Sequence, residues 1–393
     1  MTDTTRLRPE PDRPPVPQAW QPAGADPWAE AANWTTQPIP VVQDEPEPPR
    51  PAGMYVTAAV GAVLVLYSYL VALWPVRHGF TPDLVLAVRE WVTFPLGIGA
   101  DFGLFGVGLL LAAGGFWACS RLAEPGGRGR LLWRVVALGY LPYLLAGLIS
   151  FVLLFGDAEP LTEPRRADPD GMTLPMNLLL VDRVTGQDAL IGLGWGVTAA
   201  AFIAVLIAVT APMLTRGRWL ALGGLALQLV VIGLIALTGT DAGGWYHEFG
   251  QLVTWCLFGL VGQLAWIVRR HPGSGWAAAP LGVGCLVVIV AAERGYAAQA
   301  AQWLPLTFTF VALVTLLAVR ACAHGGRVDR ARLVRWLGSR AYPAALLACA
   351  IGYPLLGVLY HAKLPFGLAV VIALAVTLAL AEAVHRLGAV IAR

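Results

Sequence analysis

The stretch GAVLVLYSYLVALW, residues 61–74, contains no charged residue, and its only hydroxyl groups are those of Tyr67, Ser68 and Tyr69. A helix crosses about 30 Å of hydrocarbon with about 20 mainly apolar residues. Similar stretches recur along the 393 residues, of which 57% are hydrophobic and only 13% charged. Because backbone groups in lipid must be satisfied within each segment, the sequence predicts an all-α, polytopic membrane bundle.

Ten apolar spans follow one another after residue 53. We expect them at about 54–76, 102–120, 131–155, 189–214, 219–238, 249–268, 277–292, 303–322, 342–360 and 366–385. Residues 1–53 are rich in proline and acids and lack periodic apolar residues, which predicts a disordered tail. The chain therefore divides into this tail, as a solvated leader or a protein-binding arm, and a membrane domain over 54–393.

The basic residues alternate between the two sets of loops in phase with ten spans. One set, which includes RLAEPGGRGRLLWR (121–134) and RACAHGGRVDRARLVRWLGSR (320–340), holds 16 arginines; the other set holds seven basic residues, with 13 acids against three. Cytoplasmic loops carry the excess of Arg and Lys. The sequence therefore predicts a multi-pass protein of the cell membrane with both termini in the cytoplasm.

Two segments on the acidic side have other expected roles. The loop over 156–188 is acidic and interrupted by prolines, so it forms either a lid over an outward-facing site or a plain connector. The stretch 83–92 places Leu84, Val88, Trp91 and Val92 on one helical face, which predicts a short interfacial helix.

The short motifs of several enzyme classes are absent. No HExxH, GxSxG, Walker or dinucleotide-binding pattern occurs. None of the five cysteines forms a CxxC pair, which favours small buried hydrophobes over a metal site or a disulfide framework. The net charge of +3 is too small to indicate nucleic acid, and no cofactor is expected. The glycine runs GVGLLLAAGGF (106–116) and GLGWG (192–196) predict close helix packing.

Candidate catalytic residues lie at the outer ends of spans. His247 beside Glu248, and His361, are candidates for a general base, because imidazole titrates near neutrality. Neighbouring residues on a helix point in different directions, so the pair at 247 and 248 is not by itself a dyad. Anchoring of these side chains at headgroup level remains the alternative.

The inner arginine-rich loops are candidates for binding phosphates. Arg130 and Arg134 would suit the phosphates of an acyl-CoA donor or of anionic membrane lipids, since guanidinium groups bind phosphate in a bidentate way. Ordinary topology-setting charge is the alternative.

Several phrases, taken in order along the ten spans, resemble the membrane acyltransferase-3 family. FGVGLLLAAGGFWACSRL (105–122) looks like the family's second-span phrase ending in Ser-Gly-Phe, and RGRLLWRVVALGYLPYLLAG (128–147) looks like its arginine-containing entry into the third span. FGQLVTWCLFGLVGQLAWIVRR (249–270) and RLVRWLGSRAYPAALLACAIGYPLLGVL (332–359) are similar to its mid-chain and late segments. The resemblance covers about 54–393. It implies acyl transfer from a cytoplasmic acyl-CoA-type donor to a sugar or lipid, often across the membrane.

The resemblance assigns positions and also shows departures. It places Tyr67 or Ser68 near the family's first-span histidine, which is thought to act in acyl transfer, and Gly114 at the serine of Ser-Gly-Phe. The matching positions are Gly115, Phe116, Trp336, Gly338 and Tyr342, together with the donor-binding arginines Arg130 and Arg134, which are spaced one residue wider than in the family. The family's glycine and aromatic positions are thus kept, whereas its first-span histidine and the serine of Ser-Gly-Phe are replaced by other residues.

Three functions remain open on the sequence alone. The first is O-acyl transfer to an extracytoplasmic glycan or lipid acceptor. The second is a non-catalytic relative that binds a lipid or a membrane protein partner. The third, a small-molecule transporter, has less support because few polar groups lie within the spans and no inverted repeat is found.

Overall fold

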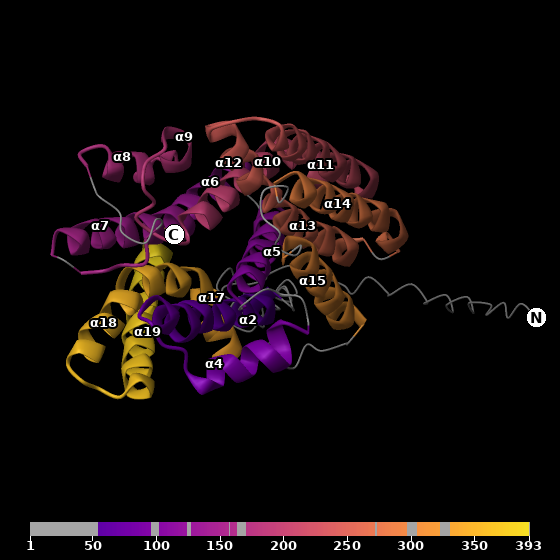
Figure 1. Cartoon of the computed structure of the whole chain (residues 1–393). Coiled ribbons are helices and arrows are strands. Elements are labelled where there is room, and N and C mark those ends of the chain that lie inside the picture. Colours follow the sequence, from indigo (N-terminus) through magenta and orange to yellow (C-terminus); the bar gives the residue numbers. More distant parts are fainter. Residues whose placement is uncertain are drawn as a thin grey trace, which may run out of the picture. The chain divides into compact units, whose positions relative to one another are not determined.

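The computed structural model describes residues 54–95, 102–123, 127–156, 158–162, 170–271, 273–296, 305–322 and 331–392. The predicted disordered tail, 1–53, lies outside these residues. The described residues belong to one compact unit, Pro51–Arg393, and they form helices and no strand (Figure 1). The predicted all-α fold is therefore confirmed for this part of the chain.

The described residues form helices of very different lengths, and several consecutive helices are continuous with one another. Their bounds are α2 Met54–Leu66, α3 Trp74–Arg77, α4 Asp83–Val88, α5 Gly103–Leu122, α6 Gly127–Val135, α7 Leu141–Phe155, α8 Thr173–Leu178, α9 Asp182–Thr185, α10 Gly194–Arg216, α11 Arg218–Thr240, α12 Trp245–Thr254, α13 Cys256–Arg270, α14 Gly275–Tyr296, α15 Pro305–Cys322, α17 Arg332–Leu347, α18 Tyr353–His361 and α19 Phe366–Ile391. Wider π-helical turns interrupt four of the stretches: η1 Tyr67–Leu73, η2 Arg89–Thr93, η3 Val136–Tyr140 and η5 Ala348–Gly352.

Nine helical stretches among the described residues are long and apolar enough to cross a membrane, which makes the chain a multi-pass membrane protein by length and composition. They match nine of the ten predicted spans. The remaining prediction, 303–322, corresponds to α15, whose described apolar part is the shorter Thr307–Leu317.

Three predicted boundaries differ from the helix ends by five residues or more. The tenth span was expected to end at 385, but α19 continues to Ile391. The fourth span was expected from 189, but the helix starts at Gly194, because residues 189–193 form a buried irregular segment. The ninth was expected from 342, but α17 starts at Arg332, since the arginine-rich residues before the apolar run continue the same helix.

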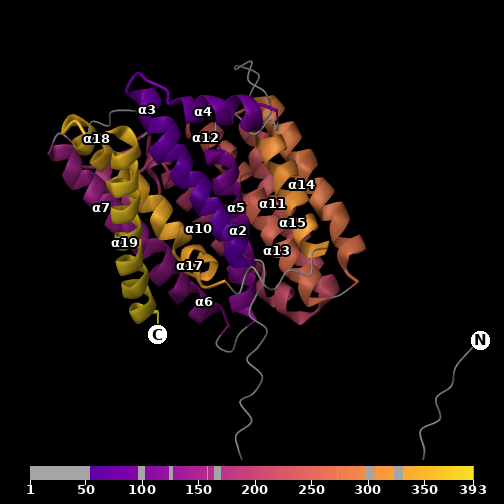
Figure 2. The same cartoon turned by 90° about the horizontal axis from the view of Figure 1, so that it is seen from below.

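Four spans pack closely through glycine. A Cβ atom on Gly61 of α2 would lie 2.9 Å from the Gly106 carbonyl oxygen of α5, and a Cβ on Gly115 of α5 would overlap the Gly259 carbonyl of α13. Gly338 of α17 packs in the same way against the backbone of Tyr55. The views in Figures 1 and 2 show α2 beside α5, with α13 and α17 on either side of the pair. Small residues at these contacts let helix backbones approach, as the glycine run over 106–116 predicted.

Buried polar side chains also join the spans. The Gln228 and Gln263 amides are reciprocally hydrogen-bonded, at 3.1 and 2.8 Å, and Gln228 Nε2 also donates to Thr210 Oγ1 at 2.7 Å. The Cys119 thiol donates to Gln263 Oε1 at 3.7 Å. This network links α5, α10, α11 and α13, and both amides are 1% exposed.

We call the end of the bundle that carries α3, α4 and α18 the outer end, and the end that carries α6 and the start of α17 the inner end (Figure 2). At the outer end α4 lies across the ends of the spans, where an interfacial helix was predicted. Leu84 and Trp91 of this segment are 64% and 80% exposed, whereas Val85 and Thr93 are buried. Its apolar face is therefore turned away from the protein.

Candidate functional site

The first span ends in a short, tightly terminated helix. Residues 74–77 form α3, with Pro75 in its first turn, and His78 is the residue that closes it. Gly79 follows with φ +86°, a left-handed conformation that favours glycine. The Phe80 amide then donates back to the Pro75 carbonyl at 3.1 Å. This turn places the His78 side chain at the outer end of the bundle.

Two contacts fix the His78 ring. His78 Nδ1 lies 2.7 Å from the Trp74 carbonyl oxygen, and the two rings stack with centroids 3.9 Å apart. A carbonyl oxygen only accepts hydrogen bonds, so Nδ1 carries the proton. The other nitrogen, Nε2, is therefore the basic atom of the neutral ring.

Glu159 faces that nitrogen. Its Oε2 atom lies 3.9 Å from His78 Nε2, and the two side chains are 48% and 20% exposed. This is an ion-pair distance and too long for a hydrogen bond, so Glu159 does not occupy the Nε2 lone pair.

The backbone beyond Glu159 docks into the bundle. The Leu161 amide donates to the Cys349 carbonyl of η5 at 3.0 Å, and the Gly192 amide donates to the Leu161 carbonyl at 2.7 Å. In a π-helical turn the regular i to i−4 bonding is interrupted, which leaves a carbonyl available to another segment. The ninth span thus holds the segment that carries Glu159.

Trp74, which stacks on the histidine, belongs to a group of packed rings, and we call Trp74, Phe80, Tyr360 and Phe366 the outer aromatic cluster. The Trp74 ring lies 5.3 Å from Tyr360 and 5.8 Å from Phe366, while Phe80 stacks on Tyr360 at 5.7 Å. These rings come from the first span, the turn after it, α18 and α19. The cluster therefore joins the end of the first span, through Trp74, to α18 and α19.

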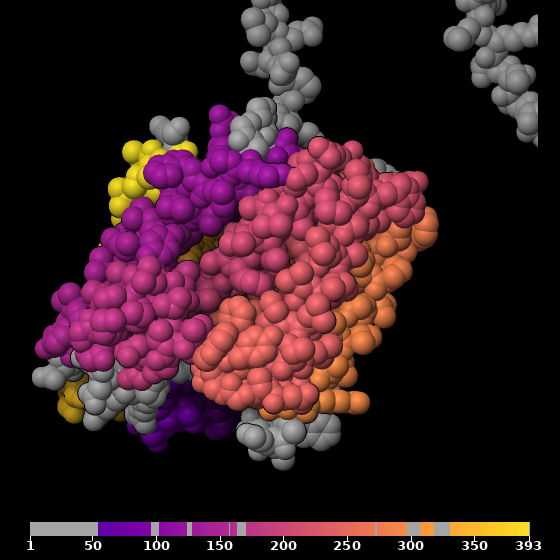
Figure 3. All heavy atoms as spheres, turned by 90° about the horizontal axis from the view of Figure 1, so that it is seen from above, coloured from indigo at the N-terminus to yellow at the C-terminus, as the bar shows by residue number. Residues whose placement is uncertain are grey.

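The segment before α10 folds back along α7. Tyr140 and Tyr143 donate to the carbonyls of Leu178 and Asn177 at 2.7 and 2.8 Å. Tyr143 precedes Phe155, the last residue of α7, by about 18 Å of helix. Figure 3 shows the magenta segments before α10 beside the pink and salmon helices that follow. Irregular backbone at membrane depth is tolerated where protein covers it, as here.

Side chains within this segment satisfy its backbone. Asn177, 2% exposed, accepts from the Leu190 amide and donates to the carbonyls of Thr173 and Asp188, all at 2.8–2.9 Å. Hydrogen bonds from the Thr173 hydroxyl and from the amides of Met172 and Thr173 hold the pKa of Asp170 below its ordinary value. The predicted loop over 156–188 is thus, in its described part, a folded segment packed on the bundle.

The predicted bases at His247, Glu248 and His361 do not meet in one site. His247 Nδ1 lies 3.1 Å from the Gly239 carbonyl, and its ring packs edge-on against Tyr296. Glu248 is exposed on the next position of α12. His361 closes α18 with an exposed side chain whose Nδ1 lies 2.7 Å from the Gly357 carbonyl.

The predicted donor-binding arginines lie at the opposite end from His78. Arg130 and Arg134 are on α6, at the inner end, where Arg130 is exposed and Arg134 half-buried. The helical stretch from Arg134 to Phe155 is about 30 Å long. The arginine pair and His78 are therefore separated by about the thickness of the hydrocarbon.

The family-motif positions of the first and second spans lie in helix packing. Tyr67 and Ser68 start η1; Tyr67 is half-buried and Ser68 is buried. The Tyr67 ring packs edge-on against Phe102. Gly115 is buried against α13 and Phe116 is half-buried beside it, whereas Gly114 is exposed with open space around it.

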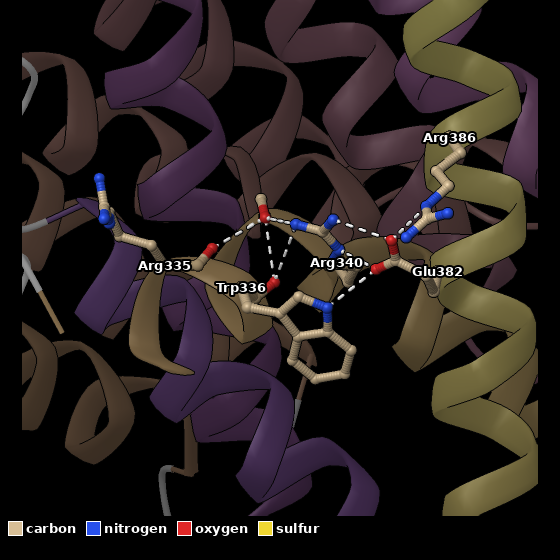
Figure 4. A network of polar contacts seen from close by, with 6 residues as sticks. Arg335, Trp336, Arg340, Glu382 and Arg386 are labelled. Carbon is tan, nitrogen blue, oxygen red and sulfur yellow. Dashed lines mark hydrogen bonds and ion pairs between the residues drawn. The ribbon is translucent and has the colours of Figure 1, made fainter. Parts of the chain in front are cut away.

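The motif positions of the ninth span lie at its inner part. Gly338 packs on α2, and Tyr342 is half-buried. The Trp336 indole donates to Glu382 Oε2 at 2.9 Å, and Arg340 binds both oxygens of that carboxylate, at 2.6 and 3.2 Å (Figure 4). Trp336 therefore serves to tie α17 to α19.

His78 and Glu159 do not stand out in the sequence. Each is a single residue in a short connecting segment, and no motif spacing relates them. The available signal was weak: His78 is a lone histidine between the aromatic residues Trp74 and Phe80 at the end of an apolar span. Among the described residues, no group of three His, Cys, Asp or Glu side chains could hold a metal ion.

Comparison of the chain with protein-family models, with curated proteins and with solved structures finds no match.

Proposed function

We propose that this chain is a membrane O-acyltransferase that crosses the cell membrane ten times with both termini in the cytoplasm, and that His78 is its general base. The single observation that carries this proposal is the His78 ring, held by the Trp74 carbonyl at 2.7 Å and faced by Glu159 at 3.9 Å. A base whose ring is oriented by one group and whose free nitrogen faces a carboxylate is an arrangement suited to hydroxyl activation.

In the proposed reaction, an acceptor hydroxyl on a glycan or lipid gives its proton to His78 Nε2 as its oxygen attacks the acyl carbonyl. The carbon–sulfur bond of the donor thioester breaks, and the thiolate leaves and takes the proton back from His78. Glu159 faces the His78 ring, at 3.9 Å from Nε2, during the interval between these two proton transfers.

The donor is a cytoplasmic acyl-CoA-type thioester in this proposal, with phosphates bound by Arg130 and Arg134. Because these arginines lie about 30 Å along the third span from its outer end, the donor must extend through the bundle to bring its acyl group to His78. The resemblance of the spans to the membrane acyltransferase-3 family supports this direction of transfer. The excess of arginine at the inner end supports the orientation.

The test uses purified full-length protein in vesicles and radiolabelled acetyl-CoA, with membrane lipids and cell-envelope glycans as acceptors. We expect label in a lipid or glycan fraction only when the protein is present. The proposal would be contradicted if the protein neither binds the donor nor transfers label to any acceptor. Tags at residues 1 and 393 test the orientation separately, since both should be protected from external protease in intact cells.

A second candidate function is a non-catalytic membrane protein that binds a lipid or a protein partner. It is favoured by the closely packed positions that match the family: Ser68 and Gly115 are buried, and Gly338 is in backbone contact with Tyr55. This alternative predicts that His78→Gln leaves the cellular phenotype unchanged.

A further inference from the structure

Arg386 occupies a distinct position near the end of the last span. It comes twenty residues after Phe366, the first residue of α19, which is about 30 Å along the helix. That distance is the thickness of the hydrocarbon core, so Arg386 lies at the inner boundary between hydrocarbon and headgroups. Its side chain is 77% exposed.

Glu382 orients this guanidinium group through one nitrogen. Arg386 Nε donates to Glu382 Oε1 at 2.6 Å, one helical turn away (Figure 4). Within the described residues, the two terminal nitrogens of Arg386 make no hydrogen bond. Because Arg340 and Trp336 also bind Glu382, the carboxylate is fixed, and it holds Arg386 with its terminal edge open.

The charges at this site do not cancel. Arg340 and Arg386 both pair with the single carboxylate of Glu382, which leaves one positive charge. An oriented guanidinium edge with unsatisfied donors matches the geometry of a phosphate group.

Lipid-facing side chains border the arginine. Leu387 and Val390 of α19 are 47% and 66% exposed. On another face of α19, the exposed Trp133 of α6 donates its indole hydrogen to the Ile391 carbonyl at 3.0 Å, close to the same end of the helix. Tryptophan is enriched at the membrane–water boundary. Apolar chains and a phosphate could both be accommodated here, as in a phospholipid.

We propose that Arg386, oriented by Glu382 and flanked on α19 by Leu387 and Val390, is a binding site for the headgroup phosphate of an anionic phospholipid. The site is separate from the proposed acyl-transfer chemistry and does not depend on it.

The experiment is a lipid titration of the purified full-length protein in neutral detergent, followed by native mass spectrometry. We expect the wild type to bind phosphatidylglycerol about fivefold or more tightly than phosphatidylcholine at its first site. Arg386→Gln should lose this preference. Arg335→Gln is the matched control, because Arg335 is also an exposed inner arginine of this cluster but points away from Glu382 (Figure 4).

Three results would overturn the proposal: no lipid preference in the wild type, equal loss in both variants, or equal competition by inorganic phosphate at the lipid concentration. The last result would mean that the site holds a free anion. If Arg386→Gln does not fold, Arg386→Lys replaces it; this variant keeps the charge but loses the guanidinium fork, and wild-type binding by it would contradict the phosphate geometry.

Discussion

Glu159 Oε2 lies 3.9 Å from His78 Nε2, although the second and third spans separate the two residues in the chain. The approach depends on a third region, because the segment carrying Glu159 is tied to the Cys349 carbonyl of η5. The turn after the first span, the exit from the third and the π-helical turn of the ninth thus build one outer site. The following predictions test the packing of the spans and of the segment before α10.

Two neighbouring glycines should respond differently to the same substitution. Gly115→Ala places a methyl group against the Gly259 backbone and should destabilise the protein by about 1–3 kcal/mol. Gly114→Ala meets nothing within 4 Å and should be neutral or slightly stabilising. Thermal unfolding in detergent measures both changes, and equal melting temperatures for the two variants would contradict the close α5–α13 contact.

The buried glutamine pair should show strong coupling. Gln228→Leu and Gln263→Leu each leave the other amide with unmatched donors and acceptors, at an expected cost of about 1–3 kcal/mol apiece. The double variant removes both amides, so its cost should be smaller than the sum. A double-mutant cycle on unfolding free energies checks this; simple additivity would show that the two amides do not depend on each other.

Asn177 should hold the re-entrant segment before α10. Asn177→Leu leaves the Leu190 amide and the Asp188 carbonyl without their partner and should increase hydrogen exchange across this segment. Thr185→Ala, in the same segment but with an exposed hydroxyl, is the control. Unchanged exchange at the Leu190 amide in Asn177→Leu would show that the segment is held by other contacts.

The turn at Asp170 should loosen in acid. The folded pKa of Asp170 is lowered, so its contribution is fully present above the ordinary carboxyl pKa and is lost as the pH falls through the lowered value. Hydrogen exchange of the Met172 and Thr173 amides, corrected for intrinsic rates, should therefore rise at low pH. In Asp170→Asn the protection should not depend on pH in this range, and an equal pH dependence in both proteins would rule out Asp170 as the titrating group.

Hydropathy predicted the bundle well because lipid imposes one requirement on every span. Hydropathy failed where backbone hydrogen bonds are satisfied by other segments of the protein instead of within a helix. Residues 189–193 are as apolar as a span, but Gly192 bonds to the Leu161 carbonyl, so this segment is buried without being part of a helix. Arg332 and Arg335 are polar, yet they continue α17, because a helix can extend past the hydrocarbon.

The site was harder to predict than the bundle. Patterns along the chain drew attention to His247 beside Glu248, whereas the pair that meets in space comes from two connecting segments. Its geometry depends on Gly79, which turns the chain after His78, and on the π-helical turn at Cys349. Neither of these two structural features is marked by a recognisable spacing of residues in the sequence. Arg130 and Arg134 stay a prediction, as does the acyl-CoA donor.

The most direct test of the account compares three histidine variants in the acyl-transfer assay. His78→Gln should reduce label transfer by about a hundredfold or more, the usual contribution of a general base. His247→Gln and His361→Gln should stay close to wild type, because in the described part of the chain neither ring forms an ion pair with a carboxylate, as His78 does with Glu159. Full transfer by His78→Gln, or its loss in either of the other two variants alone, would contradict the assignment of His78.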